Sequence, residues 1–331
     1  MNVGGIGVTG SSAANELAHA SDCVLAVGTR LQDFTTGSNT LFKQAGLVAI
    51  NANPFDALKQ DAVAVEADAR PALEALSEAL GDWRALPQWT TRAHRLANEW
   101  RETVAHVTNT PVADGLLPHE ADVIGAVQRS DDDSPAEDIV VCAAGTLPAD
   151  LQKLWRTSEP GGYHVEYGYS CMGYEVAGGL GVKLARPERE VIVIVGDGSY
   201  LMMNSELATS VMLGAKLIVV LLDNRGFGYI NRLQQACGGA PFNNLIGDCR
   251  QGGARCAGDR FRDACEIAWR VVGACVGHRR AAIRDEACAC GGSKLSDFDR
   301  HRSLATDRGR RMVVGSRRTG DFGPRGGGRC S

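Results

Sequence analysis

Two apolar runs, each followed at once by polar residues, constrain this chain more than any other feature. Residues 191–195 are five consecutive β-branched side chains followed by Gly-Asp-Gly-Ser, and residues 217–222 precede Asp-Asn-Arg-Gly. Uninterrupted apolar runs of this length are typical of strands in a parallel sheet that is buried on both faces. A helix predicted to start near Met202 connects them, so their carboxyl ends should meet at the edge where open α/β sheets bind ligands.

The polar residues after these runs indicate an anion site with a metal. Asp197 and Asn224 would reach the same sheet edge, and Gly196 and Gly198 let the backbone turn sharply and approach a ligand. Free N–H groups at the start of the following helix favour a phosphate, which repels a carboxylate unless a cation lies between them. A carboxylate, an amide oxygen and one backbone carbonyl are ligands suited to Mg²⁺. The pattern therefore predicts a site for Mg²⁺ and a diphosphate.

Other phosphate-binding motifs are absent from the sequence. There is no G-x-x-x-x-G-K-[ST] loop, and residues 177–185 lack the G-x-G-x-x-G spacing of a dinucleotide-binding turn. A Gly-Asp-Gly turn alone favours an ordinary strand-to-helix connection, so a functional interpretation depends on companion segments.

The rest of the acidic part of the chain also alternates strands with helices. Residues 22–28 are expected to form a short buried strand, 47–53 a second and 62–65 a third, followed by a helix from Pro71. Another strand is expected at 139–145, with a helix near 147–155. The fold class predicted is α/β, with doubly wound parallel-sheet domains and a disordered or non-native C-terminal tail. We divide the chain into residues 1–86, a helical linker at 87–118, a second domain at 119–245 and a tail at 246–331.

Charge separates the tail from the rest of the chain. Residues 1–245 hold 17 Lys and Arg against 29 Asp and Glu, whereas residues 246–331 hold 18 against 10, and seven of the eleven cysteines lie in the tail. The tail shows no sustained apolar period, so we favour a reading-frame error near residues 245–255. The alternative is a genuine basic tail that binds nucleic acid. The tail's lack of interleaved aromatic residues argues against this alternative. Cys288 and Cys290 lack zinc-site spacing.

The sequence gives no sign of export or of a membrane span. The first residues have neither a basic nor an apolar signal region, and no apolar run approaches the ~18 residues of a spanning helix. A cytoplasmic location is therefore expected. Cys23, Cys142, Cys171 and Cys237 form no C-x-x-C pair, so we expect reduced, structural thiols.

Taken together, the motifs resemble those of the thiamine-diphosphate-dependent enzymes that include acetolactate synthase and pyruvate decarboxylase. Besides Gly-Asp-Gly-Ser and Asn224, the segment YSCMGYEVAGGLG (169–181) is similar to the G-x-M-G segment of that family. The resemblance implies that Asp197, Asn224 and the Gly226 carbonyl bind Mg²⁺. It implies an apolar buttress for the cofactor at Met172 and an acceptor for its aminopyrimidine at the Ser170 carbonyl. The implied cofactor-binding set is Ser170, Met172, Gly196, Asp197, Gly198, Ser199, Asn224 and Gly226.

Within that family, several segments look closest to the 3D-(3,5/4)-trihydroxycyclohexane-1,2-dione hydrolases of myo-inositol catabolism. These include GTRLQDFTTGSNTLF and DNRGFGYINRLQQACGGAPFNNL. The resemblance implies opening of a cyclic 1,2-diketone to 5-deoxyglucuronate, with the cofactor accepting electrons as the C–C bond breaks. His164 is the candidate proton shuttle or hydroxyl contact, because an imidazole titrates near neutrality. An acetolactate-synthase-like carboligase and a non-catalytic product remain open. Other candidate polar contacts are Glu166, Tyr167, Asn231 and Gln234.

No residue of this chain can be assigned to one functional group of the family, the glutamate that activates the cofactor. Members use a Glu from the N-terminal pyrimidine-binding domain of a partner subunit to activate the cofactor, whereas this chain looks as if it begins inside the family's central domain. Glu166, Glu175 and Glu206 belong to the diphosphate-binding half. We therefore expect the isolated chain to be inactive, and the intact enzyme to be a homodimer or homotetramer.

Overall fold

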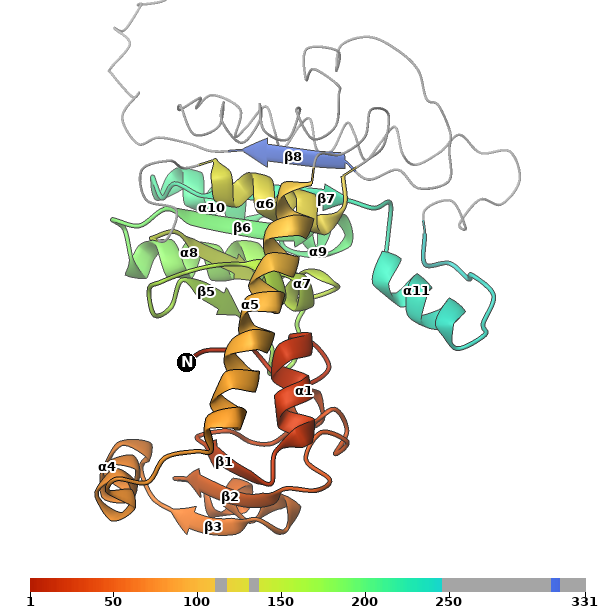
Figure 1. Cartoon of the computed structure of the whole chain (residues 1–331). Coiled ribbons are helices and arrows are strands. Elements are labelled where there is room, and N and C mark those ends of the chain that lie inside the picture. Colours follow the sequence, from red (N-terminus) through yellow and green to blue (C-terminus); the bar gives the residue numbers. More distant parts are fainter. Residues whose placement is uncertain (111–117, 131–136, 246–310, 316–331) are drawn as a thin grey trace, which may run out of the picture. The chain divides into compact units, whose positions relative to one another are not determined.

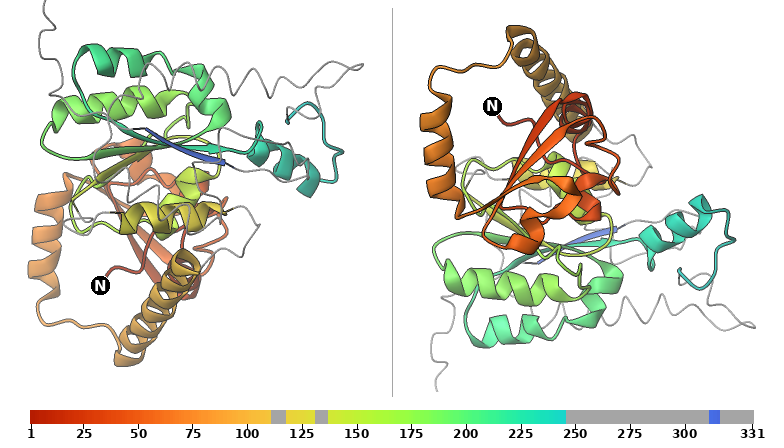
Figure 2. Two further views of the ribbon diagram at one scale, coloured as in Figure 1. Left: turned by 90° about the horizontal axis from the view of Figure 1, so that it is seen from above. Right: turned by 90° about the horizontal axis from the view of Figure 1, so that it is seen from below.

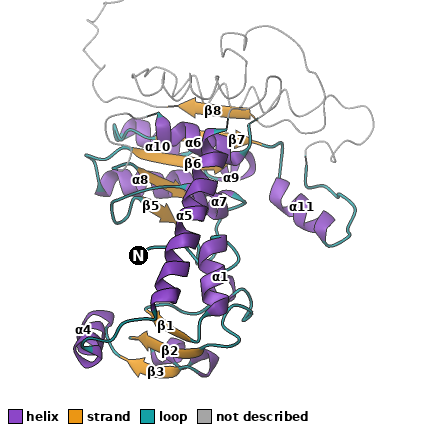
Figure 3. Cartoon of the chain, viewed as in Figure 1, coloured by secondary structure: helices purple, strands orange, loops and turns teal. Residues whose placement is uncertain are grey.

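A computed structural model describes residues 1–110, 118–130, 137–245 and 311–315, which form two units, Met1–Val107 and Thr108–Ser331 (Figure 1). Strands and helices alternate along most of the described chain (Figure 3). Apart from residues 311–315, the predictions for the tail lie outside the described residues. No helix in the described ranges is long and apolar enough to cross a membrane.

The first unit contains a three-stranded parallel sheet. Its strands are β1 (Cys23–Val27), β2 (Gly46–Asn51) and β3 (Val63–Glu66), in the order β1-β2-β3. All three lie where the sequence predicts strands. The first strand was expected to be buried, and this was wrong, since Ala26 is the only buried residue of β1. Every residue of β3 is exposed as well. The physical reason is that α4 (Ala69–Leu80), the helix following β3, has no buried residue and so covers little of this sheet.

The helices of this unit begin at recognisable caps. In α1 (Ser12–Ala20), Oγ of Ser11 accepts a hydrogen bond from the Ala14 backbone N–H at 3.0 Å. The predicted helix from Pro71 starts two residues earlier, at Ala69, which leaves Pro71 in the first turn, where its missing N–H costs nothing. The shorter helices of this unit are α2 (Asp33–Thr36), α3 (Pro54–Ala57) and the 3₁₀ turn η1 (Lys59–Asp61).

A long helix, α5 (Pro87–Asn109), packs against α1. Ala13 and Leu17 of α1 meet Ala93 and Leu96 of α5 in a buried apolar cluster. Trp89 and Trp100 of α5 pack on the same cluster. Apolar packing with α1 therefore holds this helix in place, in addition to its own helix-forming tendency.

The second unit contains a five-stranded sheet with the order β5-β4-β6-β7-β8. Its predicted strands are confirmed as β4 (Ile139–Cys142), β6 (Val191–Gly196) and β7 (Ile218–Asp223). They run parallel to one another and to a short β5 (Tyr163–Val165). The last strand, β8 (Arg311–Gly315), pairs antiparallel with β7. The sequence did not indicate this strand, because the tail shows no period of two.

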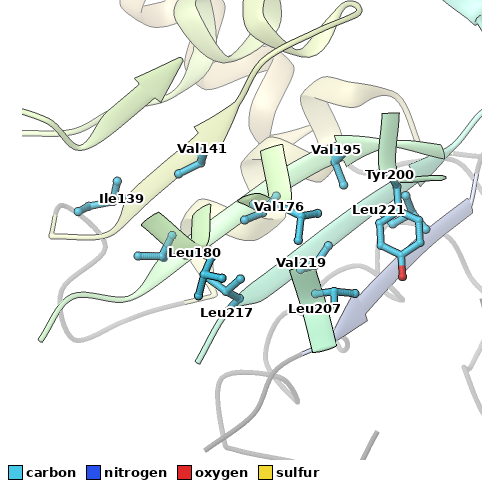
Figure 4. Packing of buried hydrophobic residues seen from close by; sticks show 12 residues of the cluster. Ile139, Val141, Val176, Leu180, Val195, Tyr200, Leu207, Leu217, Val219 and Leu221 are labelled. Carbon is cyan, nitrogen blue, oxygen red and sulfur yellow. The ribbon is translucent and has the colours of Figure 1, made fainter. Parts of the chain in front are cut away.

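Helices cover both faces of this sheet, which explains the uninterrupted apolar runs (Figure 2). On one face lie α6 (Glu120–Arg129) and α7 (Leu147–Leu154), and on the other lie α8 (Tyr174–Ala185) and α10 (Glu206–Met212). Alternate strand residues point to opposite faces, so Val193 and Ile194 are both fully buried, on different sides. Burying each such side chain contributes roughly 1.5–3 kcal/mol. The cluster under α8 and α10 is shown in Figure 4 and consists of Ile139, Val141, Val176, Leu180, Val191, Val193, Val195, Tyr200, Leu207, Leu217, Val219 and Leu221.

The helix after β6 departs from the prediction of a start near Met202. A short helix, α9 (Asp197–Met202), begins directly after the strand with extended Gly196 as its N-cap, and α10 follows as a separate helix from Glu206. Glycine is accepted at an N-cap, and an aspartate in the first turn is favoured by the helix dipole. A last helix, α11 (Gly228–Ala236), follows β7.

The packing of α8 on β6 predicts opposite effects for two glycines of that helix. A Cβ on Gly179 would lie 2.3 Å from Cγ2 of Val193, whereas a Cβ on Gly181 would meet nothing within 4 Å. We expect Gly179→Ala to lower the free energy of unfolding by about 1–3 kcal/mol through overpacking. Gly181→Ala should raise it by about 0.5–1 kcal/mol, because alanine is the better helix former. Urea denaturation followed by circular dichroism checks both, and equal effects of the two substitutions would contradict this packing.

Candidate functional site

The carboxyl edge of the second sheet contains a point where the chain changes direction. From β4 the chain passes through α7 to β5 on one side, then through α8 across to β6 on the other side of β4. In open α/β sheets the crevice at such a switch is the usual ligand site. Three segments meet there: the residues just after β4, the loop at 166–173, and the turn from Gly196 to Ser199.

Asp197 lies at this edge and joins β6 to the loop after β7. It is buried, and its Oδ2 accepts a hydrogen bond from the Gly226 backbone N–H at 2.8 Å. Burial, together with the neighbouring Asp223, raises the pKa of Asp197 to about 6, opposed by the backbone N–H groups of Gly198 and Gly226. Two carboxylates thus lie close together, and Arg225 reaches only Asp223, at 3.7 Å.

Asn224 brings a third oxygen group to the same place. One atom of its side-chain amide lies 3.3 Å from Oδ1 of Asp197 and 2.5 Å from the carbonyl oxygen of Gly226. With the amide nitrogen at that position, the group donates to both oxygens. With the amide oxygen there, three oxygens face one another and need a cation between them. Neighbouring ligands of an octahedral Mg²⁺ lie about 2.9 Å apart, which these two distances bracket.

The donor set suits a hard cation that keeps part of its shell for water or phosphate. Within the described ranges no group of three or more His, Cys, Asp and Glu could hold a metal ion. One carboxylate, one amide and one carbonyl are instead the kind of incomplete oxygen set that Mg²⁺ shares with phosphates. The residues present therefore fit this ion.

The backbone at Gly226 fixes the loop that presents the carbonyl. Its φ of 140° is open to glycine, and a Cβ there would lie 2.4 Å from the Asn244 carbonyl oxygen. Phe227 donates its backbone N–H to that same oxygen at 2.7 Å. A close approach of residues 226–227 to Asn244 thus requires glycine at this position.

Ser199 has its hydroxyl engaged inside the protein. The hydroxyl donates to Oε2 of Glu175 at 2.7 Å and accepts from the backbone N–H of Gly173, also at 2.7 Å. Ser199 was predicted to meet the diphosphate, and its backbone N–H in the first turn of α9 is the group that remains for this role. The sequence did not indicate Glu175 as a partner, because a contact between residues this far apart leaves no local pattern.

An apolar rim borders Gly198. A Cβ on Gly198 would lie 2.8 Å from Cε1 of Phe227 and 3.6 Å from Cε of Met172. The Met172 side chain is 37% exposed, so it stands at the surface of the edge. Ser170 has a positive φ of 53°, and its hydroxyl donates to the Ala143 carbonyl at 3.1 Å. The predicted buttress and the predicted carbonyl thus lie on one loop beside the Gly196 turn, and their roles stay predictions.

His164 is paired with a tyrosine that the sequence analysis did not single out. Its Nε2 lies 2.6 Å from the hydroxyl of Tyr174, and the two rings are nearly parallel with centroids 5.9 Å apart. Burial raises the pKa of Tyr174, and the negative charge of Glu166 adds to this effect. His164 therefore has a proton partner at this edge of the sheet, as a shuttle requires.

Glu166 supports the loop that carries Ser170 and Met172. Its carboxylate accepts backbone N–H groups from Cys171 at 2.7 Å and Tyr169 at 2.9 Å. The hydrogen bond from Cys171, followed by that from Tyr169, lowers the pKa of Glu166. This carboxylate therefore stays ionised and shapes the loop.

The remaining candidate polar contacts lie half-buried in two places. Gln234 of α11 donates to the Ala240 carbonyl and accepts from the Asn244 amide, so it stabilises its own loop. Asn231 has a buried Oδ1 without a hydrogen-bond partner. Tyr167 lies next to Glu166. A substrate contact by any of the three stays a prediction.

Comparison with known proteins agrees with this geometry. Residues 143–252 match the family described as "Thiamine pyrophosphate enzyme, C-terminal TPP binding domain", and residues 1–76 match "Thiamine pyrophosphate enzyme, central domain". The chain contains two domains of the thiamine pyrophosphate enzyme family. Thiamine pyrophosphate is the same compound as thiamine diphosphate, so the predicted resemblance is confirmed.

Its curated relatives include proteins named 3D-(3,5/4)-trihydroxycyclohexane-1,2-dione hydrolase. The relative from Geobacillus thermodenitrificans is 45% identical over 266 residues, covering 73% of this chain and 40% of the relative. That from Halalkalibacterium halodurans is 41% identical, covering 73% and 41%, and that from Bacillus subtilis is 40% identical, covering 73% and 41%. The chain thus spans about two fifths of the length of these thiamine pyrophosphate enzymes.

Burial at the end of β4 predicts which cysteines of this thiamine pyrophosphate enzyme chain react. Cys142 is buried beside the Tyr163 hydroxyl, and burial raises the pKa of its thiol to about 12. At pH 8 only about one thiol in ten thousand is then a thiolate, the form that attacks alkylating agents. Cys23, Cys171 and Cys237 are exposed free thiols. Peptide mapping after iodoacetamide should find these three labelled in the folded protein and Cys142 labelled only in urea; rapid labelling of folded Cys142 would contradict its burial.

Proposed function

We propose that this chain binds thiamine diphosphate together with Mg²⁺, as the cofactor-binding part of an enzyme that hydrolyses a C–C bond in a cyclic 1,2-diketone. The observation that carries the proposal is the convergence of oxygen groups from Asp197, Asn224 and Gly226 at the carboxyl edge of β6 and β7. In this proposal the side-chain oxygens of Asp197 and Asn224 and the Gly226 carbonyl bind the ion. Its charge offsets the repulsion between Asp197 and Asp223.

The chain's own residues would bind and orient the rest of the cofactor. Gly198 has no side chain, and the backbone N–H groups of Gly198 and Ser199 at the start of α9 suit a diphosphate oxygen. Met172 and Phe227, which border Gly198, offer an apolar surface to the cofactor's ring. When bound, thiamine diphosphate supplies an electron sink for breaking a C–C bond next to a carbonyl.

His164 is the group that we assign to proton movement near the substrate. The hydroxyl of Tyr174 holds Nε2 of His164 at 2.6 Å, which fixes one ring nitrogen and leaves Nδ1 for another partner. A ring that carries hydroxyl groups needs such polar contacts. The relatives' name, trihydroxycyclohexane-1,2-dione hydrolase, supports a substrate of this kind.

We propose that the glutamates of the diphosphate-binding half do not supply the cofactor-activating group that the family uses. Glu175 is hydrogen-bonded inside the protein, Glu166 closes its own loop, and Glu206 lies in the first turn of α10. We therefore propose that this chain contributes the metal and diphosphate half of a site. The other half would come from a further segment or subunit, within a homodimer or homotetramer.

Substitution of the proposed metal ligand tests cofactor binding. Asp197→Ala removes one ligand of the ion, so Mg²⁺-dependent binding of thiamine diphosphate should fall by at least about a hundredfold. Isothermal titration calorimetry with and without Mg²⁺ measures it. Glu188→Gln is the matched control, since Glu188 is an exposed acid whose nearest charge partner, Arg186, lies 3.8 Å away. Binding by Asp197→Ala as tight as that of the control would refute the metal site.

An activity assay tests the half-site proposal separately. The purified chain with thiamine diphosphate, Mg²⁺ and the cyclic diketone should bind cofactor and yet open no ring, because in this proposal the activating glutamate comes from the other half of the site. Ring opening is followed by appearance of the acid product, and acetolactate formation from pyruvate is assayed in parallel for a carboligase. Sustained turnover in either assay would contradict the half-site proposal without contradicting the proposal that the chain binds the cofactor.

A further inference from the structure

We infer that Glu175 is a positioning residue that holds together the three segments forming the cofactor cradle. This inference rests on the proposed function, since the cradle is the proposed binding site. Glu175 lies in the first turn of α8 and is not among the residues that the family resemblance assigns to cofactor or metal.

The carboxylate accepts hydrogen bonds from each of the three segments. Oε1 accepts the backbone N–H of Ala144, which follows β4, at 3.3 Å. Oε2 accepts the backbone N–H of Gly173 at 3.1 Å and the hydroxyl of Ser199 at 2.7 Å. One side chain thus joins the end of β4, the loop that presents Met172, and the first turn of α9.

The interior of the protein makes this contact costly to lose. Glu175 is 1% exposed, and among the described residues no ion pair involves it. A buried carboxylate is tolerated when donors satisfy both of its oxygens, and here three donors do so. A glutamine would offer a single accepting oxygen in place of two. At least one of the three donors would then lose its partner.

The position of these contacts distinguishes a cradle from a general core interaction. Ala144 and Ser199 lie on either side of the switch between β4 and β6, and Gly173 begins the helix that crosses between them. Ser199 is the neighbour of Gly198, and Gly173 is the neighbour of Met172. The carboxylate therefore sets the spacing between the proposed diphosphate turn and the proposed ring contact without touching either ligand group.

The experiment compares Glu175→Gln, Ser199→Ala and the double variant with wild type and with Glu188→Gln, the exposed control. The first measurement is amide hydrogen exchange without ligand. Glu175→Gln should speed exchange at Ala144, Gly173 and the first turn of α9 by about tenfold, and elsewhere in the chain by less than about twofold. The second measurement is the Kd for thiamine diphosphate with Mg²⁺, by calorimetry at a temperature where every variant is folded.

The Kd of Glu175→Gln should rise about fivefold or more, while that of Glu188→Gln stays within about twofold of wild type. Glu175 acts partly through Ser199, so the two substitutions should not be independent. The Kd of the double variant should therefore rise by less than the product of the fold-changes in the two single variants. Exchange that rises uniformly or nowhere, or a Kd unchanged in Glu175→Gln, overturns the inference. If wild type binds no cofactor, the proposed function fails, and exchange alone then decides on Glu175: a rise confined to the three segments supports it.

Discussion

The site depends on the in-register pairing of β6 with β7. Gly196 pairs with Leu222, so Asp197 follows one strand and Asn224 the other at nearly the same height along the sheet. The hydrogen bond from the Gly226 N–H to Asp197 then joins the two strand ends. A shift of one residue in this register would turn every side chain to the opposite face and separate the two polar groups. The apolar runs that build the core therefore also set the geometry of the ligand edge.

Three buried acidic side chains gather at that edge. Residues 139–142, 191–195 and 218–222 of the strands are all apolar, whereas Asp197, Asp223 and Glu175 are buried around the strand ends. Glu175 is satisfied by three donors. Burial, and after it the repulsion from Asp223, raises the pKa of Asp197. An arrangement that lowers the stability of the folded chain in this way is typical of a site that is completed by a ligand.

Local pattern was sufficient to predict the strands and the place of the site, but not its internal contacts. β4, β6 and β7 were predictable because burial on both faces leaves apolar residues at every position, and the polar residues that follow mark the strand ends. The start of α9 was misplaced because Gly196 and Gly198 were taken as loop formers, although the first of them caps a helix. The bonds of Glu175 to Ser199 and of His164 to Tyr174 join separate segments, and such contacts exist only once the fold has formed.

The burial of β1 was misjudged for a related reason. Its run of apolar residues favours a strand, but whether a face is covered depends on where neighbouring helices pack. The hydroxyl of Ser199 illustrates the same limit of local pattern. A hydroxyl next to a glycine turn suits a phosphate in isolation, and only the fold reveals that this hydroxyl donates to Glu175. The predicted contact of Ser199 with the diphosphate stays a prediction.

The apolar rim of the site is also open to oxidation. Met172, Met202 and Met203 are all partly exposed at 37%, 51% and 41%, and the last two lie against Gly173. Oxidants convert exposed thioethers to sulfoxides, which are polar and chiral. Oxidation of Met172 would therefore place a polar group on the surface proposed for the cofactor's ring, while the apolar core behind it stayed intact. A preparation could keep its fold and its secondary structure after storage in air and still have lost the apolar surface that we propose for binding.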